Sequence, residues 1–137
     1  MNFVSLHNHS EYSFLDGMST PSQTAKRLFE LNQPAYSVTD HGVLYGHVPF
    51  NKEFKKIGKH IVLGVEAYVV ENLTKERGYN HLTILAKNNV GYQNLLKLAN
   101  LSNKQFYYKP RITFEQVSER LEGLILLSGC FNDGWFI

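Results

Sequence analysis

The chain contains a single cysteine, which excludes an internal disulfide framework and any zinc site built from several cysteines. Charge is also scarce, with 14 Lys and Arg against 12 Asp and Glu and a formal net charge of +2. This small charge argues against nucleic-acid binding through a strongly basic surface. Apolar runs long enough to span a bilayer are absent, and the first residues lack a secretory-signal pattern. We therefore expect a cytoplasmic protein without membrane contact.

The composition that remains is that of one globular domain of 137 residues, 43% of them hydrophobic. In its first half, apolar periodicity and turn residues predict strands alternating with helices. The expected strands are 3–6, 35–38 and 61–70, and the expected helices lie between Thr20 and Pro34 and around 50–57. This alternation favours a parallel sheet with right-handed crossovers.

The second half of the chain begins with a different kind of connection. About ten polar residues without a helical stripe follow Val70, too few for a parallel crossover. The next strand, 81–86, is therefore expected to return antiparallel. A helix at about 91–101 and a second helix, capped by Thr113 and Gln116, precede the last strand at 124–127. We expect this last strand to point the same way as the first three.

Metal-ligand side chains follow the expected strands. His7 and His9 leave the first strand, and their spacing of two residues places both imidazoles on one side. His41 follows the second strand beside Asp40, and Glu66 lies within the third. Because function collects at the carboxyl ends of strands in such sheets, we expect these side chains to meet at one rim.

Two further donors are expected at the same rim. His81 opens the returning strand, and Cys130 follows the last one. Nitrogen, carboxylate and thiolate donors that converge in this way predict a transition-metal site. Taken alone, however, Cys130 would be interpreted as a small buried hydrophobic residue.

Other residues have simpler interpretations. Asp16 in Leu-Asp-Gly is also typical of a turn. Lys109 and Arg111 lie in an aromatic loop, where they either clamp a phosphate or support the loop. His47 and His60 are interpreted as surface or core residues without a functional role.

Several segments together resemble the PHP (polymerase and histidinol phosphatase) domain family. They are HNHSEYS at 7–13, LDG at 15–17, TDHG at 39–42 and GVEAY at 64–68. Four more resemble the N-terminal PHP domain of bacterial DNA polymerase III alpha subunits in particular. These are HLTILAKN at 81–88, GYQNL at 91–95, YYKPR at 107–111 and EGLILLSGC at 122–130.

The resemblance implies a fold and a ligand set. The fold is an α/β, distorted (β/α)7 barrel that holds up to three zinc or manganese ions. The implied ligands are His7, His9, Asp16, His41, Glu66, His81 and Cys130. Asp40 is implied as a catalytic residue that orients these ligands without binding the metal itself.

The sequence differs from the family's pattern in two respects. The family's later strands and its Asp-x-His ligand pair do not follow Cys130, and the tail 131–137 does not resemble the family's continuation. We therefore expect residues 1–137 to form the N-terminal portion of a single PHP domain, truncated to about five strands. A fragment, a split gene product and a truncated viral form all remain open.

The resemblance implies metal-dependent phosphodiesterase chemistry of the 3′–5′ exonuclease type in the intact domain, with poor activity expected of this chain alone. Its implied partners are the remainder of the polymerase alpha subunit, DNA through that remainder, and a proofreading exonuclease subunit. Two alternatives stay open. One is a free-standing PHP phosphatase for a small phosphate monoester, and the other is a non-catalytic scaffold that stabilises the polymerase.

Overall fold

The computed structural model describes residues 3–75 and 77–130, so the tail 131–137 lies outside the described residues. Its elements in chain order are α1 (Pro21–Glu30), β1 (Ala35–Val38), α2 (His47–Lys56), β2 (His60–Val70), β3 (Asn80–Ala86), α3 (Asn89–Lys104), β4 (Arg111–Thr113), α4 (Phe114–Ser118) and β5 (Leu124–Leu127). Within the described ranges, every helix is too short or too polar to cross a membrane.

The five strands form one mixed sheet in the order β1-β2-β3-β5, with β4 paired to β2. β1 and β2 are parallel, and β3 is antiparallel to both β2 and β5. The expected antiparallel return after Val70 and the direction of the last strand are therefore confirmed. β4 was not predicted, because a strand of three residues is too short to carry a periodic pattern.

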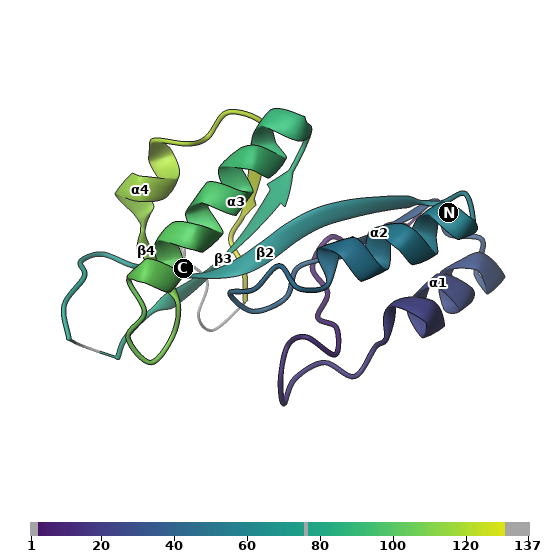
Figure 1. The fold of residues 1–137 in the computed structure, drawn as a ribbon, viewed down its shortest axis with the longest axis horizontal. Coiled ribbons are helices and arrows are strands. Elements are labelled where there is room, and N and C mark those ends of the chain that lie inside the picture. The colour runs from purple at the N-terminus through teal and green to yellow at the C-terminus, as the bar shows by residue number, and fades with distance from the viewer. Residues whose placement is uncertain (1–2, 76, 131–137) are drawn as a thin grey trace.

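β2 is the central strand of the fold, because it contributes to two separate hydrophobic cores. Figure 1 shows it extending from the pair α1 and α2 to the pair α3 and α4. At one end, α1 and α2 lie together over a core of Ala25, Leu28, Val38, Phe50 and Phe54. At the other end, α3 and α4 cover a core built from β2, β3 and β4, with Val69, Leu82, Ile84, Leu95 and Ile112 among its buried residues.

The segment 3–6 is not a strand, contrary to the prediction. It runs beside β1, where the Ser37 N–H donates to the Ser5 carbonyl at 3.3 Å and the Thr39 N–H to the Asn8 carbonyl at 3.0 Å. The Asn8 N–H, however, donates to Thr39 Oγ1 at 2.9 Å. A side-chain oxygen thus takes the place of a main-chain acceptor, and no regular ladder forms.

The start of α3 packs directly against the turn that precedes β5. Asn88 caps the helix by accepting the Gly91 N–H at 2.9 Å, and the Lys87 N–H donates to the Gly123 carbonyl at 2.8 Å. A Cβ at Gly91 would lie 1.8 Å from the Gly123 carbonyl oxygen. The absence of a side chain at Gly91 therefore permits this contact.

We predict that Gly91→Ala destabilises the protein. In a helix this substitution ordinarily stabilises by about 1 kcal/mol, but here the methyl group collides with main-chain atoms. We expect a loss of roughly 1–3 kcal/mol in the free energy of unfolding, measured by denaturant titration.

Gly78→Ala is the matched control, because no atom lies within 4 Å of the added methyl position. Its free energy of unfolding should change by no more than about 0.5 kcal/mol. A Gly91→Ala protein as stable as the parent would contradict the close packing of α3 on the turn.

Candidate metal centre

Glu66 lies at the middle of β2 and is completely buried, with 0% exposure. Its N–H donates to the Asp40 carbonyl at 3.1 Å, and its carbonyl accepts the Gly42 N–H at 2.9 Å. On the opposite edge of β2, it pairs with Thr83 of β3. Because β-pairing holds its main chain on both sides, the position of the carboxylate is well defined.

Four histidines and the cysteine surround this carboxylate. The distances to its nearer oxygen are 3.1 Å from His7 Nε2, 3.2 Å from His9 Nε2, 2.7 Å from His41 Nδ1 and 3.4 Å from His81 Nδ1. Cys130 Sγ lies 3.1 Å from Glu66 Oε1 and 3.3 Å from His81 Nδ1. Side chains from five separate stretches of the chain thus meet at one point.

Asp16 joins the cluster from the loop before α1. Its Oδ2 atom lies 2.9 Å from His41 Nε2 and 3.8 Å from His9 Nε2. The donors form three overlapping groups, each with its ligand atoms within 4.8 Å of one another: His7–His9–Glu66, His9–Asp16–His41 and His41–Glu66–His81. The structure therefore brings all seven predicted metal ligands together.

The arrangement of these atoms fits a bound cation. His7 Nε2, His41 Nδ1 and Glu66 Oε2 are buried and make no hydrogen bond among the described residues. They nevertheless lie within 2.7–3.2 Å of neighbouring donors. Ligand atoms this close to one another can bind one shared ion. Imidazole, carboxylate and thiolate together suit a divalent transition metal.

The charges of the centre are coupled through Glu66. Burial by itself raises the pKa of Glu66, but contacts with His41, His7 and His9 outweigh this effect and hold the pKa well below its usual range. Conversely, the Glu66 carboxylate raises the pKa of His41, against the opposing effect of burial and with help from Asp16. Without metal, the centre therefore retains protons that a cation would replace.

Asp40 does not face the metal donors. Its buried carboxylate accepts hydrogen bonds from the Ser10 N–H at 2.7 Å, from Ser10 Oγ at 2.8 Å and from Ser13 Oγ at 2.7 Å. Ser13 Oγ in turn accepts the His41 N–H at 3.2 Å and lies 3.4 Å from His9 Nδ1. Asp40 therefore reaches the histidines through Ser13, and its predicted catalytic role stays a prediction.

Sequence reasoning missed Ser10 and Ser13 as parts of the site, although both are buried. Their only sequence signal is their position inside the HNHSEYS segment. Serine is so common in turns that this signal does not predict a hydrogen bond to an aspartate 27 or 30 residues away.

The two predicted phosphate ligands are separated. Lys109 lines the same cavity as Asp16, His41 and His81, with its Nζ atom 5.1 Å from the Tyr68 ring centre. Arg111 is buried in β4 and lines a different pocket, where it donates to the Thr74 carbonyl at 3.0 Å and stacks on Tyr107. The two cations therefore do not form one clamp, and the position of Arg111 fits its alternative role of supporting the loop.

The two histidines interpreted as non-functional lie away from the donors. His47 is buried with Nε2 2.8 Å from the Gly64 carbonyl, and desolvation lowers its pKa. His60 is exposed at the start of β2. The positions of both fit structural or surface roles.

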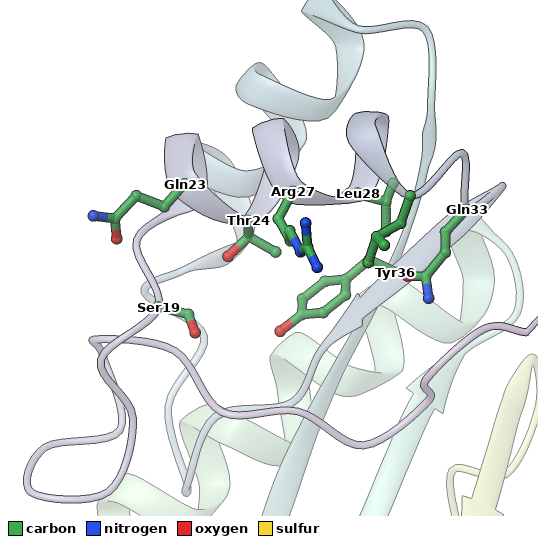
Figure 2. Close-up of a pocket in the computed structure, with 8 residues that line it drawn as sticks. Ser19, Gln23, Thr24, Arg27, Leu28, Gln33 and Tyr36 are labelled. Carbon is green, nitrogen blue, oxygen red and sulfur yellow. The ribbon is translucent and has the colours of Figure 1, made fainter.

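Two of the cavities are relevant to the choice of site. The cavity over the metal donors has a volume of about 660 Å³ and is lined by Asp16, His41 and His81 together with many aromatic residues. A pocket of about 320 Å³ lies beside α1 and β1 (Figure 2), where Tyr36, Arg27, Thr24 and Ser19 face one another. None of the predicted metal ligands lines this second pocket, so the larger cavity is the opening of the candidate centre.

Comparison with known proteins identifies the class. A model of the PHP domain matches residues 5–135, and the chain therefore belongs to the PHP domain family. Two solved structures share the fold. One is from Bifidobacterium adolescentis and assigned to the metal-dependent phosphoesterases (TM-score 0.51, 19% identity, 74% of this chain and 34% of that one). The other is an amidohydrolase from Chromobacterium violaceum (TM-score 0.53, 22% identity, 76% and 35%).

Comparison with curated proteins identifies one kind of relative within this family. The chain is 41% identical to the DNA polymerase III alpha subunit of Borreliella burgdorferi, over 95% of this chain and 12% of that protein. It is also 41% identical to the Thermus aquaticus subunit, over 96% of this chain and 12% of that protein. Its identity to the Helicobacter pylori subunit is 42%, over 95% of this chain and 11% of that protein. The predicted resemblance is thus confirmed, and the chain spans about 12% of the length of such relatives.

We predict that Ser13→Ala destabilises the fold around the centre. The substitution leaves the buried Asp40 carboxylate without one of its hydrogen-bond donors and the His41 N–H without its acceptor. Loss of a hydrogen bond to a charged group should lower the free energy of unfolding by about 1.5–3 kcal/mol, measured by denaturant titration.

Ser22→Ala is the control, since Ser22 is exposed in the first turn of α1. Its effect should stay within about 0.5 kcal/mol. Equal stability of the two variants would show that Asp40 does not depend on Ser13.

Proposed function

We propose that this chain is the N-terminal portion of the PHP domain of a DNA polymerase III alpha subunit and that its centre, in the intact domain, hydrolyses phosphodiesters with divalent metal ions. The observation that carries the proposal is the convergence of six metal-ligand side chains around a seventh, the buried Glu66 carboxylate. Similarity to the alpha subunits supports the assignment to a polymerase.

The three donor groups can hold up to three zinc or manganese ions. His7, His9 and Glu66 form the first site, His9, Asp16 and His41 the second, and His41, Glu66 and His81 the third, with Cys130 beside it. Bound divalent ions lower the pKa of a water molecule and neutralise charge on phosphoryl oxygens.

The remaining residues position the substrate and the ligands. Lys109 lies in the cavity wall, where its ammonium group can contact a phosphate oxygen. Asp40 and Ser13 hold the main chain of His41 and the ring of His9 in place. Fixed ligand orientation of this kind is what metal sites in enzymes require.

The proposal includes partners. The rest of the alpha subunit is the principal one, and DNA reaches this domain through it in the cytoplasm. A proofreading exonuclease subunit is a further partner. If the centre instead serves a monoester phosphatase, a small phosphate monoester should be the better substrate. If the domain is only a scaffold, metal should bind without hydrolysis.

The direct test replaces two ligands. In the double variant His7→Ala and His9→Ala, two of the three donor groups are broken, so elemental analysis of protein purified without chelator should show most zinc or manganese lost. With the parent sequence in the full alpha subunit, hydrolysis of a dinucleotide phosphodiester should require added Mn²⁺ or Zn²⁺ and exceed that of a sugar monophosphate. It should fall at least about tenfold with the double substitution.

His60→Ala is the control for this test, because His60 is exposed and belongs to none of the donor groups. It should retain both metal and activity. Parental metal content in the double variant would disprove the ligand assignment. Metal binding without hydrolysis would favour the scaffold when it is found in the full alpha subunit, because poor activity is expected of this chain alone.

The pH dependence of metal binding should follow His41. Glu66 raises its pKa above the ordinary value of 6.5, and metal binds only the neutral imidazole. Below that raised pKa a metal ion must displace a proton, so the affinity for Zn²⁺ should fall as the pH is lowered through it, beginning above pH 6.5. Calorimetric titration should also show proton release in this range. An affinity that does not change across it would contradict the coupling of His41 to Glu66.

A further inference from the structure

Among the described residues, each side-chain hydrogen-bond donor that contacts the Glu66 carboxylate is itself a predicted metal ligand. These donors are His7, His9, His41, His81 and Cys130. A histidine nitrogen or cysteine sulfur that binds a metal ion is deprotonated, so that atom no longer donates a hydrogen bond. Carboxylates that bind metals are ordinarily held by hydrogen bonds from residues outside the ligand set. Glu66 therefore needs a donor that is not a ligand.

Thr83 lies where such a donor is needed. In the register of β2 and β3 it is directly opposite Glu66. Directly paired residues of antiparallel strands point to the same face of the sheet, with their Cβ atoms about 4.5–5.5 Å apart. The alternation along β3 agrees, because Leu82 and Ile84, on either side of Thr83, pack in the hydrophobic core on the other face. The Thr83 side chain is therefore on the face of the metal centre.

The hydroxyl group of Thr83 is buried and unsatisfied. Thr83 is 0% exposed, and its Oγ1 atom makes no hydrogen bond among the described residues. Every other buried serine or threonine hydroxyl in that part of the chain has a partner: Ser10 and Ser13 contact Asp40, Ser37 and Thr39 contact Asn8, and Ser102 contacts the Ala99 carbonyl. Because buried polar groups are nearly always hydrogen-bonded, the exception at Thr83 requires an explanation.

The neighbours of Thr83 across the sheet leave one candidate partner. On the side of β5 it pairs with Leu127, which has an apolar side chain. On the side of β2 it pairs with Glu66, whose Oε2 atom is also buried without a hydrogen bond among the described residues. A hydroxyl donor and a carboxylate acceptor thus occupy paired positions, and each can satisfy the other.

We propose that Thr83 is a positioning residue of the metal centre, whose hydroxyl group donates a hydrogen bond to the Glu66 carboxylate when the histidines bind metal. This hydrogen bond replaces contacts that the carboxylate loses to the histidines, and it fixes the orientation of the carboxylate. Thr83 acts through Glu66 and does not bind the metal itself. The inference rests on the metal centre of the proposed function, although not on its hydrolytic activity.

The test is Thr83→Val, which replaces the hydroxyl group with a methyl group of nearly the same size. Loss of a hydrogen bond to a metal ligand typically weakens metal binding by roughly 10- to 100-fold. We therefore expect the Kd for Zn²⁺, measured by competition with a chromophoric chelator, to rise at least about tenfold. Thr83→Ser, which keeps the hydroxyl group, should restore most of the affinity.

The same substitution should affect the metal-free protein differently. There the Thr83 hydroxyl lacks a hydrogen bond, so its replacement by a methyl group removes an unsatisfied polar group. Metal-free Thr83→Val should therefore unfold at the same denaturant concentration as the parent, or at a higher one. A purely structural role would instead lower this stability together with the affinity for Zn²⁺, so the two measurements separate positioning from packing.

Thr24→Val is the matched control, because it makes the same change at a half-buried position in α1. The Thr24 hydroxyl donates to the Thr20 carbonyl at 2.8 Å, and Thr24 belongs to none of the metal-donor groups. This variant should bind Zn²⁺ like the parent.

The outcomes distinguish this inference from the proposed function. Parental Zn²⁺ affinity in Thr83→Val, equal loss of affinity in Thr83→Ser, or lower metal-free stability of Thr83→Val would each overturn the inference. None of these results affects the proposed function if hydrolysis depends on His7 and His9. Conversely, Zn²⁺ binding that depends on the Thr83 hydroxyl would support the inference even if the full alpha subunit proves inactive in hydrolysis.

Discussion

The burial of the Glu66 carboxylate is the constraint around which this structure is organised. A carboxylate without solvent contact is destabilising by several kcal/mol unless compensating groups surround it. Here the compensation comes from His7, His9, His41 and His81, which arrive from distant parts of the chain. The fold must therefore bring these segments together, and their contacts with Glu66 then hold them there.

β2 connects this centre to both hydrophobic cores. Its first residues pair with β1 and its last residues pair with β4 along the same edge, while β3 occupies the opposite edge. Glu66 lies between these two pairings, at the bridge to His41. The centre is thus supported from both cores, as positioning of ligands to within a fraction of an ångström requires.

The buried part of the site and its outer wall contain different kinds of side chains. Titratable groups are concentrated around Glu66, where burial strengthens every electrostatic interaction. The outer wall carries aromatic rings and the Lys109 ammonium group instead. A domain with balanced charge can therefore combine a strongly charged interior site with a nearly neutral surface.

The sequence by itself determined what depends on near neighbours in the chain. The capping box of Thr113 and Gln116, the helices near 21–30 and 89–104 and the antiparallel return after Val70 follow from local patterns, and the structure contains all of them. The metal-ligand residues could also be predicted, because His7, His9, His41 and Glu66 lie at or after the expected strands.

Only the tertiary structure decided what depends on partners far along the chain. It placed a side-chain hydrogen bond, in which Thr39 Oγ1 accepts the Asn8 N–H, where regular pairing after the predicted strand at 3–6 would continue. It also directed Asp40 to Ser10 and Ser13 and separated Arg111 from Lys109. Local periodicity carries no information about which distant atom completes a hydrogen bond or which cavity a side chain enters.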